Sequence, residues 1–131
     1  MLMWRLMRDS KVGVSNIQHK IYSMSFSSIY LLYVAKIQKK GKVIEELHEI
    51  VEWLTGYTSD ALTKIIDSEV TLQEFFENAP ILNSKRTLIT GVICGIRVEN
   101  IDEPLMQQIR YLDKLVDELA KGKKMASILR H

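Results

Sequence analysis

The sequence predicts an all-α protein, an orthogonal bundle of about five to seven short helices. Apolar residues recur at three- and four-residue steps in several segments, and residues that start or stop helices lie between those segments. Six glycines and two prolines among 131 residues leave little room for long loops. A chain of this length fits one domain with its own hydrophobic core.

The first two predicted helices cover residues 25–40 and 43–55. Lysines crowd the end of the first helix, where cations oppose the helix dipole, and four glutamates lie away from the apolar stripe of the second. Gly41 and Gly56 suit the left-handed position that stops a helix. So short a connection predicts a helical hairpin or a sharp corner. The two apolar stripes are Phe26, Ile29, Tyr30, Tyr33, Val34 and Ile37, and Ile44, Leu47, Ile50, Val51 and Leu54.

Two shorter helices are predicted next, the first at residues 59–67. The second begins at a capping box, in which Thr71 and Glu74 each satisfy a free backbone N–H group of the other residue. It ends before Pro80, because the residue before a proline disfavours the helical conformation.

Residues 84–98 fit two patterns. A buried helix capped by Asn83 or Ser84 would bury Leu88, Ile89, Val92, Ile93 and Ile96, whereas a strand would align Thr90, Val92, Cys94, Ile96 and Val98. We predict the helix, since a lone strand would have no partner, and keep a short strand within residues 86–98 as the alternative. On a helix, Gly91 and Gly95 would share one face and permit close approach of another backbone.

The clearest predicted helix follows, with Asp102 as its N-cap, Pro104 in the first turn and Gly122 after its end. A last short helix covers residues 124–130. The apolar stripe of the long helix is continuous enough to serve a partner as well as a core. Its members are Leu105, Met106, Ile109, Leu112, Leu115, Val116 and Leu119.

We expect residues 1–15 to form a flexible N-terminal extension and residues 16–131 a single helical domain. Arg5 and Arg8 interrupt the apolar N-terminus, whereas a secretory signal needs an uninterrupted apolar region of at least ~7 residues. No run approaches the ~20 apolar residues that span a bilayer. One cysteine excludes an intramolecular disulfide and suits a reducing compartment. These features predict a cytoplasmic protein without a membrane partner.

The candidate thiol and metal motifs favour structural roles. Cys94 lies in an apolar run, and no motif places a histidine beside it, so we interpret it as a packed core thiol. Glu45 and His48 form one Glu-x-x-His unit with Glu52 a turn further, but a helical di-iron site needs two such units and two more carboxylates. We therefore predict no metal and no cofactor.

The nearly balanced net charge makes nucleic-acid binding an unfavoured alternative, which two basic clusters keep open. Eighteen Lys and Arg against sixteen Asp and Glu give a formal net charge of +2, which supplies no global attraction to phosphates. Two basic clusters can contact phosphates, but neither carries interleaved aromatic residues or a recognition motif. The clusters are Lys36, Lys39, Lys40 and Lys42, and Lys121, Lys123, Lys124 and Arg130.

Four charged residues are set into the most apolar part of the chain: Arg97, Glu99, Arg110 and Asp113. The simplest interpretation places them on a solvated face. The alternative turns Arg110 and Asp113 inward or towards an interface, where charges are kept only when they are paired. We take the four as a candidate ionic network or ligand site.

Several long strings resemble one family of small bacterial proteins, a domain of unknown function numbered 2200. They are KIYSMSFSSIYLLYVAKIQKKGK, EIVEWLTGY, FFENAPILN, LITGVICGIRVENIDEPLMQQIRYLDKLVDELAKGK and KMASILR. The resemblance covers about residues 17–131; the chain departs from the family pattern at Leu31 and at Val43, where proline and threonine are usual. It implies a small, mostly helical cytosolic domain, but no activity and no catalytic residue.

The sequence favours a non-enzymatic protein-interaction or regulatory module, with a homo-oligomer or a protein as partner. No catalytic constellation is assembled by any motif, and the stripe of the long helix offers a surface. A small-molecule binder or enzyme that uses Arg97, Arg110 and Asp113 is the alternative. A weak nucleic-acid binder is the second alternative.

Overall fold

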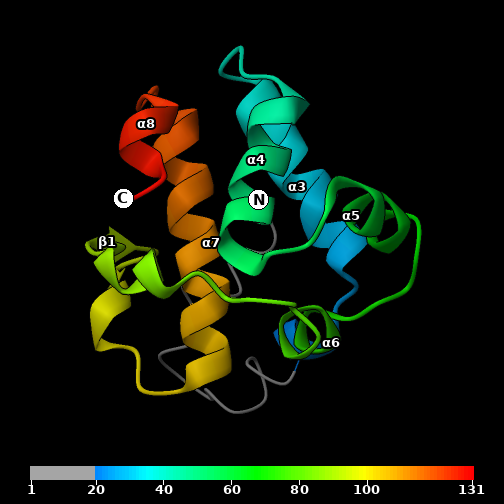
Figure 1. Cartoon of the computed structure of the whole chain (residues 1–131). Helices are drawn as coiled ribbons and strands as arrows, with labels where there is room; N and C mark the ends of the chain where they lie inside the picture. Colours follow the sequence, from blue (N-terminus) through cyan, green and yellow to red (C-terminus); the bar gives the residue numbers. More distant parts are fainter. Residues whose placement is uncertain (1–19) are drawn as a thin grey trace.

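The computed structural model describes residues 20–131 and is mostly helical, a small helical bundle as the sequence predicts (Figure 1). The α-helices are α3 (Phe26–Gln38), α4 (Ile44–Thr55), α5 (Ser59–Ile66), α6 (Leu72–Glu77), α7 (Pro104–Ala120) and α8 (Met125–Ile128). Two 3₁₀ turns, η2 (Ser84–Leu88) and η3 (Val98–Asn100), flank a hairpin of β1 (Val92–Ile93) and β2 (Ile96–Arg97). The predicted extension at residues 1–15 lies outside the described residues.

Three helices, α3, α4 and α7, pack together as the centre of the bundle. In Figure 1, α5 and α6 are seen nearly end-on while α7 runs down the view, so they cross α7 steeply. The hairpin lies on the opposite side of α7 from α5. The core is formed where the stripes of these helices meet, and it includes the fully buried Phe26, Ile29, Ile37, Leu47, Ile50, Leu54, Leu112 and Leu115.

The starts of the helices show how local sequence sets this arrangement. Ser25 and Thr71 accept hydrogen bonds from the N–H groups of Ser28 and Glu74, which confirms the capping box of α6. Val43 cannot accept such a bond, but its own N–H group donates to Glu46 Oε1 at 3.3 Å. One of the two hydrogen bonds of a capping box is therefore present at the start of α4. A threonine at position 43 could make both.

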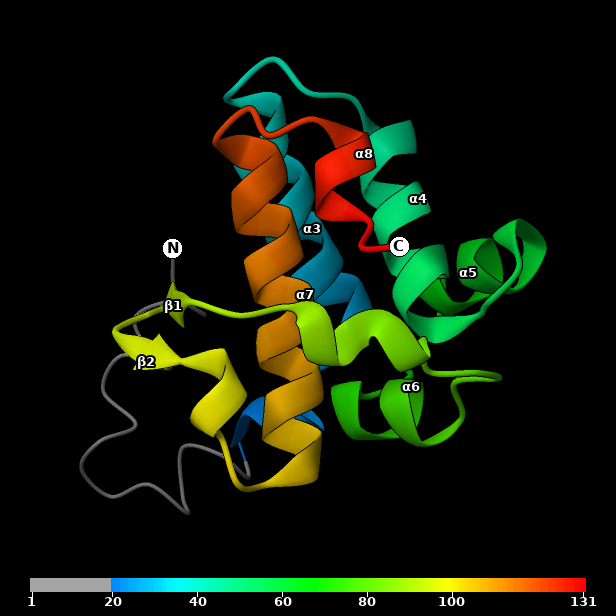
Figure 2. The same cartoon turned by 60° about the vertical axis from the view of Figure 1, so that its left-hand side comes forward.

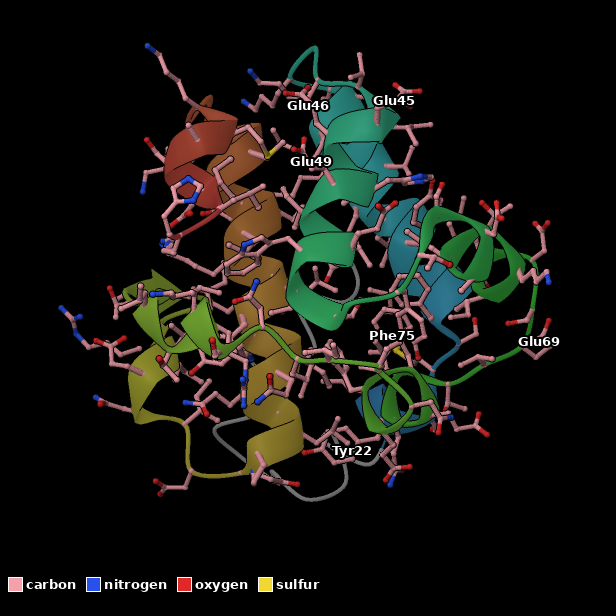
Figure 3. The ribbon with its side chains drawn as sticks, viewed as in Figure 1. Tyr22, Glu45, Glu46, Glu49, Glu69 and Phe75 are labelled. Atoms are coloured by element: carbon pink, nitrogen blue, oxygen red, sulfur yellow. The ribbon has the colours of Figure 1, made fainter. Side chains whose placement is uncertain are left out.

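An aromatic stack joins α6 to the start of α3. The rings of Phe26 and Phe75 stack with centroids 4.0 Å apart, and Tyr57 packs on Phe75 at 5.0 Å. Figure 3 shows Phe75 inside the molecule, whereas Glu45, Glu46 and Glu49 point outwards from α4. The glutamates thus form the polar face expected of an amphipathic helix.

The helix predicted at residues 84–98 is wrong. Residues 92–97 form an antiparallel hairpin that pairs Val92 with Arg97 and Ile93 with Ile96. Cys94 and Gly95 turn the chain with φ of 52° and 79°, the left-handed pair that a tight two-residue hairpin requires. The sequence alone indicated no partner for a strand in this segment. The partner strand lies within the same segment, two residues further along the chain. Gly95 serves this turn and Gly91 precedes the first strand, so the two glycines do not share a helix face.

Helix α7 begins one residue later than predicted, since Glu103 and not Asp102 is its N-cap. The Tyr22 hydroxyl donates to Glu103 Oε1 at 2.5 Å, which ties this start to the beginning of the described chain. Most of the α7 stripe is buried within the domain, including Ile109, Leu115 and Leu119. The apolar surface that suggested a partner is therefore used by the core.

Candidate functional site

The structure divides the four predicted site residues into two pairs. Arg97 is the last residue of the hairpin and Glu99 follows it. The two form an ion pair at the surface at 3.0 Å, with the Arg97 side chain 59% exposed. Arg110 and Asp113 lie on α7 and are buried, with exposed fractions of 1% and 0%. The four residues thus do not converge on one surface.

Asp113 is held against α3. The Tyr33 hydroxyl donates a hydrogen bond to Asp113 Oδ1, while Oδ2 has no hydrogen-bond partner among the described residues. Burial raises the pKa of Asp113 to about 7, although the bond from Tyr33 and the charges of Arg110 and Lys36 act to lower it. Burial likewise raises the pKa of Tyr33 well above its usual value, so this hydroxyl remains a donor.

Arg110 connects the same stretch of α7 to the hairpin. Its Nη1 donates to the carbonyl oxygen of Ile93 at 3.4 Å, and one turn further Lys114 Nζ donates to the carbonyl oxygen of Val92 at 3.2 Å. Glu99 Oε1 accepts a hydrogen bond from the N–H group of Gly91, just before the first strand, at 3.0 Å. This bond is the main cause that lowers the pKa of Glu99. The bonds from Arg110 and Lys114 hold the hairpin against α7.

A pocket of about 520 Å³ opens one turn beyond the buried pair. It lies between α3 and α7, which run in the same direction, because Tyr33 and Lys36 contact Asp113 and Asp117 in that order. Both views show the two helices ending at the same end of the molecule (Figure 2). The lining residues are Ala35, Lys36, Lys39, Lys40, Asp117, Ala120 and Lys121.

The charges of this pocket are unequal. Asp117 is the one carboxylate among its described lining residues, and it bridges Lys36 and Lys121 at 3.0 Å each. Burial acts to raise the pKa of Asp117, but the hydrogen bonds from Lys121 and Lys36 outweigh it and lower the pKa. Within residues 20–131, neither Lys39 nor Lys40 takes part in an ion pair. The pocket therefore holds a surplus of positive charge.

Two helix C-termini oppose part of that surplus. Each carries roughly half a negative charge from its unpaired carbonyl groups, and both α3 and α7 end beside the pocket. Four lysines and one aspartate leave three positive charges, so about two remain after the two helix ends are counted. The partial negative charges at the two helix ends therefore balance only part of the positive charge of the lysines.

A second hollow of about 350 Å³ adjoins the first. The two share Asp117 and Lys121, and the second adds Lys114, Glu118, Gly122 and Lys123. Glu118 is held by Arg130 at 2.6 and 2.9 Å, and Lys123 lies 3.5 Å from it. Both carboxylates of this region are thus occupied by cations from the chain itself.

Sequence reasoning identified the lysines but not the pocket. Lys36, Lys39 and Lys40 belonged to one basic cluster and Lys121 and Lys123 to another, about 80 residues apart along the chain. The sequence holds no signal that α3 and α7 run parallel and end together. Neither hollow is lined by Arg97, Glu99, Arg110 or Asp113.

The remaining candidates have local partners. Cys94 is half-buried in the hairpin turn and packs on the core. The Tyr30 hydroxyl and His48 Nε2 lie 2.7 Å apart, so the histidine is engaged with α3. No group of three or more His, Cys, Asp or Glu side chains in the described residues is placed to hold a metal ion. In the same part of the chain, every helix is too short or too polar to cross a bilayer.

Fold and pocket together define a small helical-bundle domain with a cationic hollow between two helix ends. The chain belongs to the family described as an uncharacterised protein conserved in bacteria, DUF2200, whose model matches residues 20–130. It is similar to a solved structure, the crystal structure of uncharacterized protein SP1917, at 48% identity and a TM-score of 0.80. That similarity covers 84% of this chain and 90% of the other. No curated protein matches the chain.

The family resemblance expected from the sequence is confirmed, and with it the mostly helical domain. Both the family and the similar solved protein are described as uncharacterised, so neither carries an activity or a site residue to this chain. The pocket is therefore the feature of the chain from which a function can be inferred.

Proposed function

We propose that this chain is a non-enzymatic regulatory module that binds a small anionic ligand in the pocket between α3 and α7. The observation that carries the proposal is the surplus of lysines around a hollow of about 520 Å³. That volume lies within the roughly 300–1,000 Å³ typical of small-molecule sites. The lysine ammonium groups supply charge-assisted hydrogen bonds to carboxylate or phosphate oxygens.

The lining favours binding over chemistry. Its one described carboxylate already bridges Lys36 and Lys121, so Asp117 serves to position those two cations. Lys39 and Lys40 are exposed directly after α3. They take part in no ion pair within residues 20–131, so their ammonium groups are available to a ligand. Binding would fix the ends of α3 and α7 to one another, and a ligand can in this way change how the domain meets a partner.

The other functions expected from the sequence stay predictions. A ligand site or active site at Arg97, Glu99, Arg110 and Asp113 would require two buried side chains to become accessible. Self-association would need a surface other than the buried stripe of α7. Nucleic-acid binding would draw on the same lysines and would weaken steeply with salt. Location in the cytoplasm, expected from the interrupted apolar N-terminus, the lack of a long apolar run and the single thiol, is likewise a prediction.

The test is a calorimetric titration with tripolyphosphate at low salt. We expect binding that Lys39→Ala/Lys40→Ala weakens at least about tenfold, because two of the four pocket cations are lost. The matched control is Lys64→Ala/Lys85→Ala, which removes two exposed lysines outside both hollows and should leave the affinity within about twofold. Absence of binding, or equal weakening by the control, would overturn the proposal.

A further inference from the structure

The two hollows lie next to one another. They share Asp117 and Lys121, which stand between them as a common wall. The salt bridge between these two residues measures 3.0 Å, and the Lys121 side chain is 73% exposed. An exposed lysine side chain can swing aside at little cost. A ligand longer than the first pocket can therefore continue into the second.

The walls of the two hollows differ in chemistry. Ala35, Ala120 and the methylene stems of lysines make the wall of the first pocket mostly carbon, with ammonium groups around it. It is hollow because two small residues, Ala35 on α3 and Ala120 on α7, stand there. The second hollow is lined almost entirely by charged side chains and Gly122. The first suits the carbon body of a ligand, and the second suits a chain of anionic groups.

Surplus cations are present in both hollows. Lys39 and Lys40 line the first. In the second, Lys114 Nζ donates to the Val92 carbonyl oxygen and has no ion pair within residues 20–131. Lys123 shares Glu118 with Arg130, which binds that carboxylate more closely. Across both hollows six lysines face two carboxylates, so the excess of cations increases when the second hollow is included.

We infer that the ligand is an organic polyphosphate, with its carbon body over Ala35 and Ala120 and its phosphate chain extending past Asp117 to Lys114 and Lys123. This inference rests on the proposed anion-binding function and adds the class and orientation of the ligand. A short organic phosphate would leave the second hollow empty. An inorganic polyphosphate can be bound by the lysines of either hollow, but it would leave the carbon wall at Ala35 and Ala120 uncovered. The site thus selects for a ligand that has both parts.

Three probes separate these contributions in Mg²⁺-free titrations: ATP has both parts, AMP has the body with one phosphate, and tripolyphosphate has only the chain. We expect ATP to bind at least about tenfold more tightly than either of the others. Lys114→Ala/Lys123→Ala should reduce ATP to the affinity of AMP while changing AMP less than about twofold. Ala35→Leu, which fills the first pocket, should reduce ATP to the affinity of tripolyphosphate.

The titrations distinguish the anion-binding proposal from the inference that the ligand is an organic polyphosphate. Equal affinity for the three probes, with neither variant changing their order, would overturn the organic-polyphosphate inference and leave anion binding intact. Failure of every probe to bind would overturn both. Because Lys114 also holds the hairpin, its variant is checked by melting, and Lys123→Ala alone provides a second test that leaves the Val92 contact in place.

Discussion

Two neighbouring stretches of α7 carry charge in opposite ways. Around Arg110 and Asp113 the charged groups are buried, tied to Tyr33 on α3 and to the hairpin carbonyl of Ile93. Around Asp117 and Lys121 the same two helices open into a solvent-accessible pocket with more cations than anions. The stretches are one turn apart, so the difference does not come from the helix itself.

The two stretches of α7 differ because different parts of the chain pack against them. The hairpin at residues 92–97 covers the first stretch, and its carbonyl groups accept hydrogen bonds from α7. In the second stretch, Ala35 and Ala120 are too small to close the space between α3 and α7. Buried charges have to be satisfied by the fold, whereas exposed surplus charges are available to a ligand. The first stretch is therefore part of the packed interior, and the second is the better candidate for binding.

Removing one cation from each stretch should give the largest difference in the free energy of unfolding. Arg110→Ala leaves a cavity beside the buried Asp113 and removes the bond to the Ile93 carbonyl oxygen. We expect a loss of about 3–5 kcal/mol in the free energy of unfolding. Lys121→Ala removes a side chain that is 73% exposed, and should cost less than about 1 kcal/mol. Urea unfolding of both variants measures this. Similar losses would contradict the division of α7 into a structural and a binding stretch.

Protonation of Asp113 gives the next largest effect. Burial raises its pKa from 3.8 to about 7, so between these values the folded state binds more protons than the unfolded state. The free energy of unfolding should then fall as pH rises from about 4 to 7, by on the order of 3 kcal/mol from this group. The charged and titratable groups around Asp113 are Tyr33 and Lys36 on α3 and Arg110 and Asp117 on α7.

Asp113→Asn isolates this effect, because the amide oxygen can still accept from Tyr33 but does not titrate. Unfolding of the two proteins at about pH 4.5 and pH 8 should show the variant gaining relative to the wild type as pH rises. Other titrating groups cancel in the difference. Parallel curves for the two proteins would show that Asp113 is ionised in the folded state throughout.

Loosening the hairpin should have the smallest effect and should be confined to the buried stretch. Gly95 has a φ of 79°, and a Cβ added there would meet no atom within 4 Å. Gly95→Ala therefore costs only the backbone strain, about 1–2 kcal/mol, measured by thermal unfolding. Tripolyphosphate affinity should not change, because the hairpin turn lies outside the pocket. A linked loss of affinity would show that the two stretches act together.

The helices could be predicted because their signals are local. Three- and four-residue apolar spacing located α3, α4 and α7, while Thr71 with Glu74 and Gly56 marked an N-terminus and a C-terminus. The hairpin could not be located in this way. Each strand is two residues long, and Cys94 replaces the asparagine or aspartate that usually precedes glycine in such a turn.

The site was predicted less well, because its geometry depends on tertiary contacts. Arg110 and Asp113 were identified as charges in an apolar setting, and the structure does bury them. Arg97 and Glu99 shared the same apolar run, but the hairpin carries them to the surface. The pocket needs the ends of α3 and α7 to meet, and residue spacing within one helix does not indicate its neighbours. Basic clusters at two helix ends were the only sequence signal for it.

The most direct test follows backbone amide NMR shifts of residues 20–131 during titration with ATP. We predict that the perturbed amides cluster at residues 35–40 and 114–123, the ends of α3 and α7 that form the two hollows. Perturbation centred instead on the hairpin at residues 92–99 and on Arg110 and Asp113 would contradict the assignment and return the site to the buried charges.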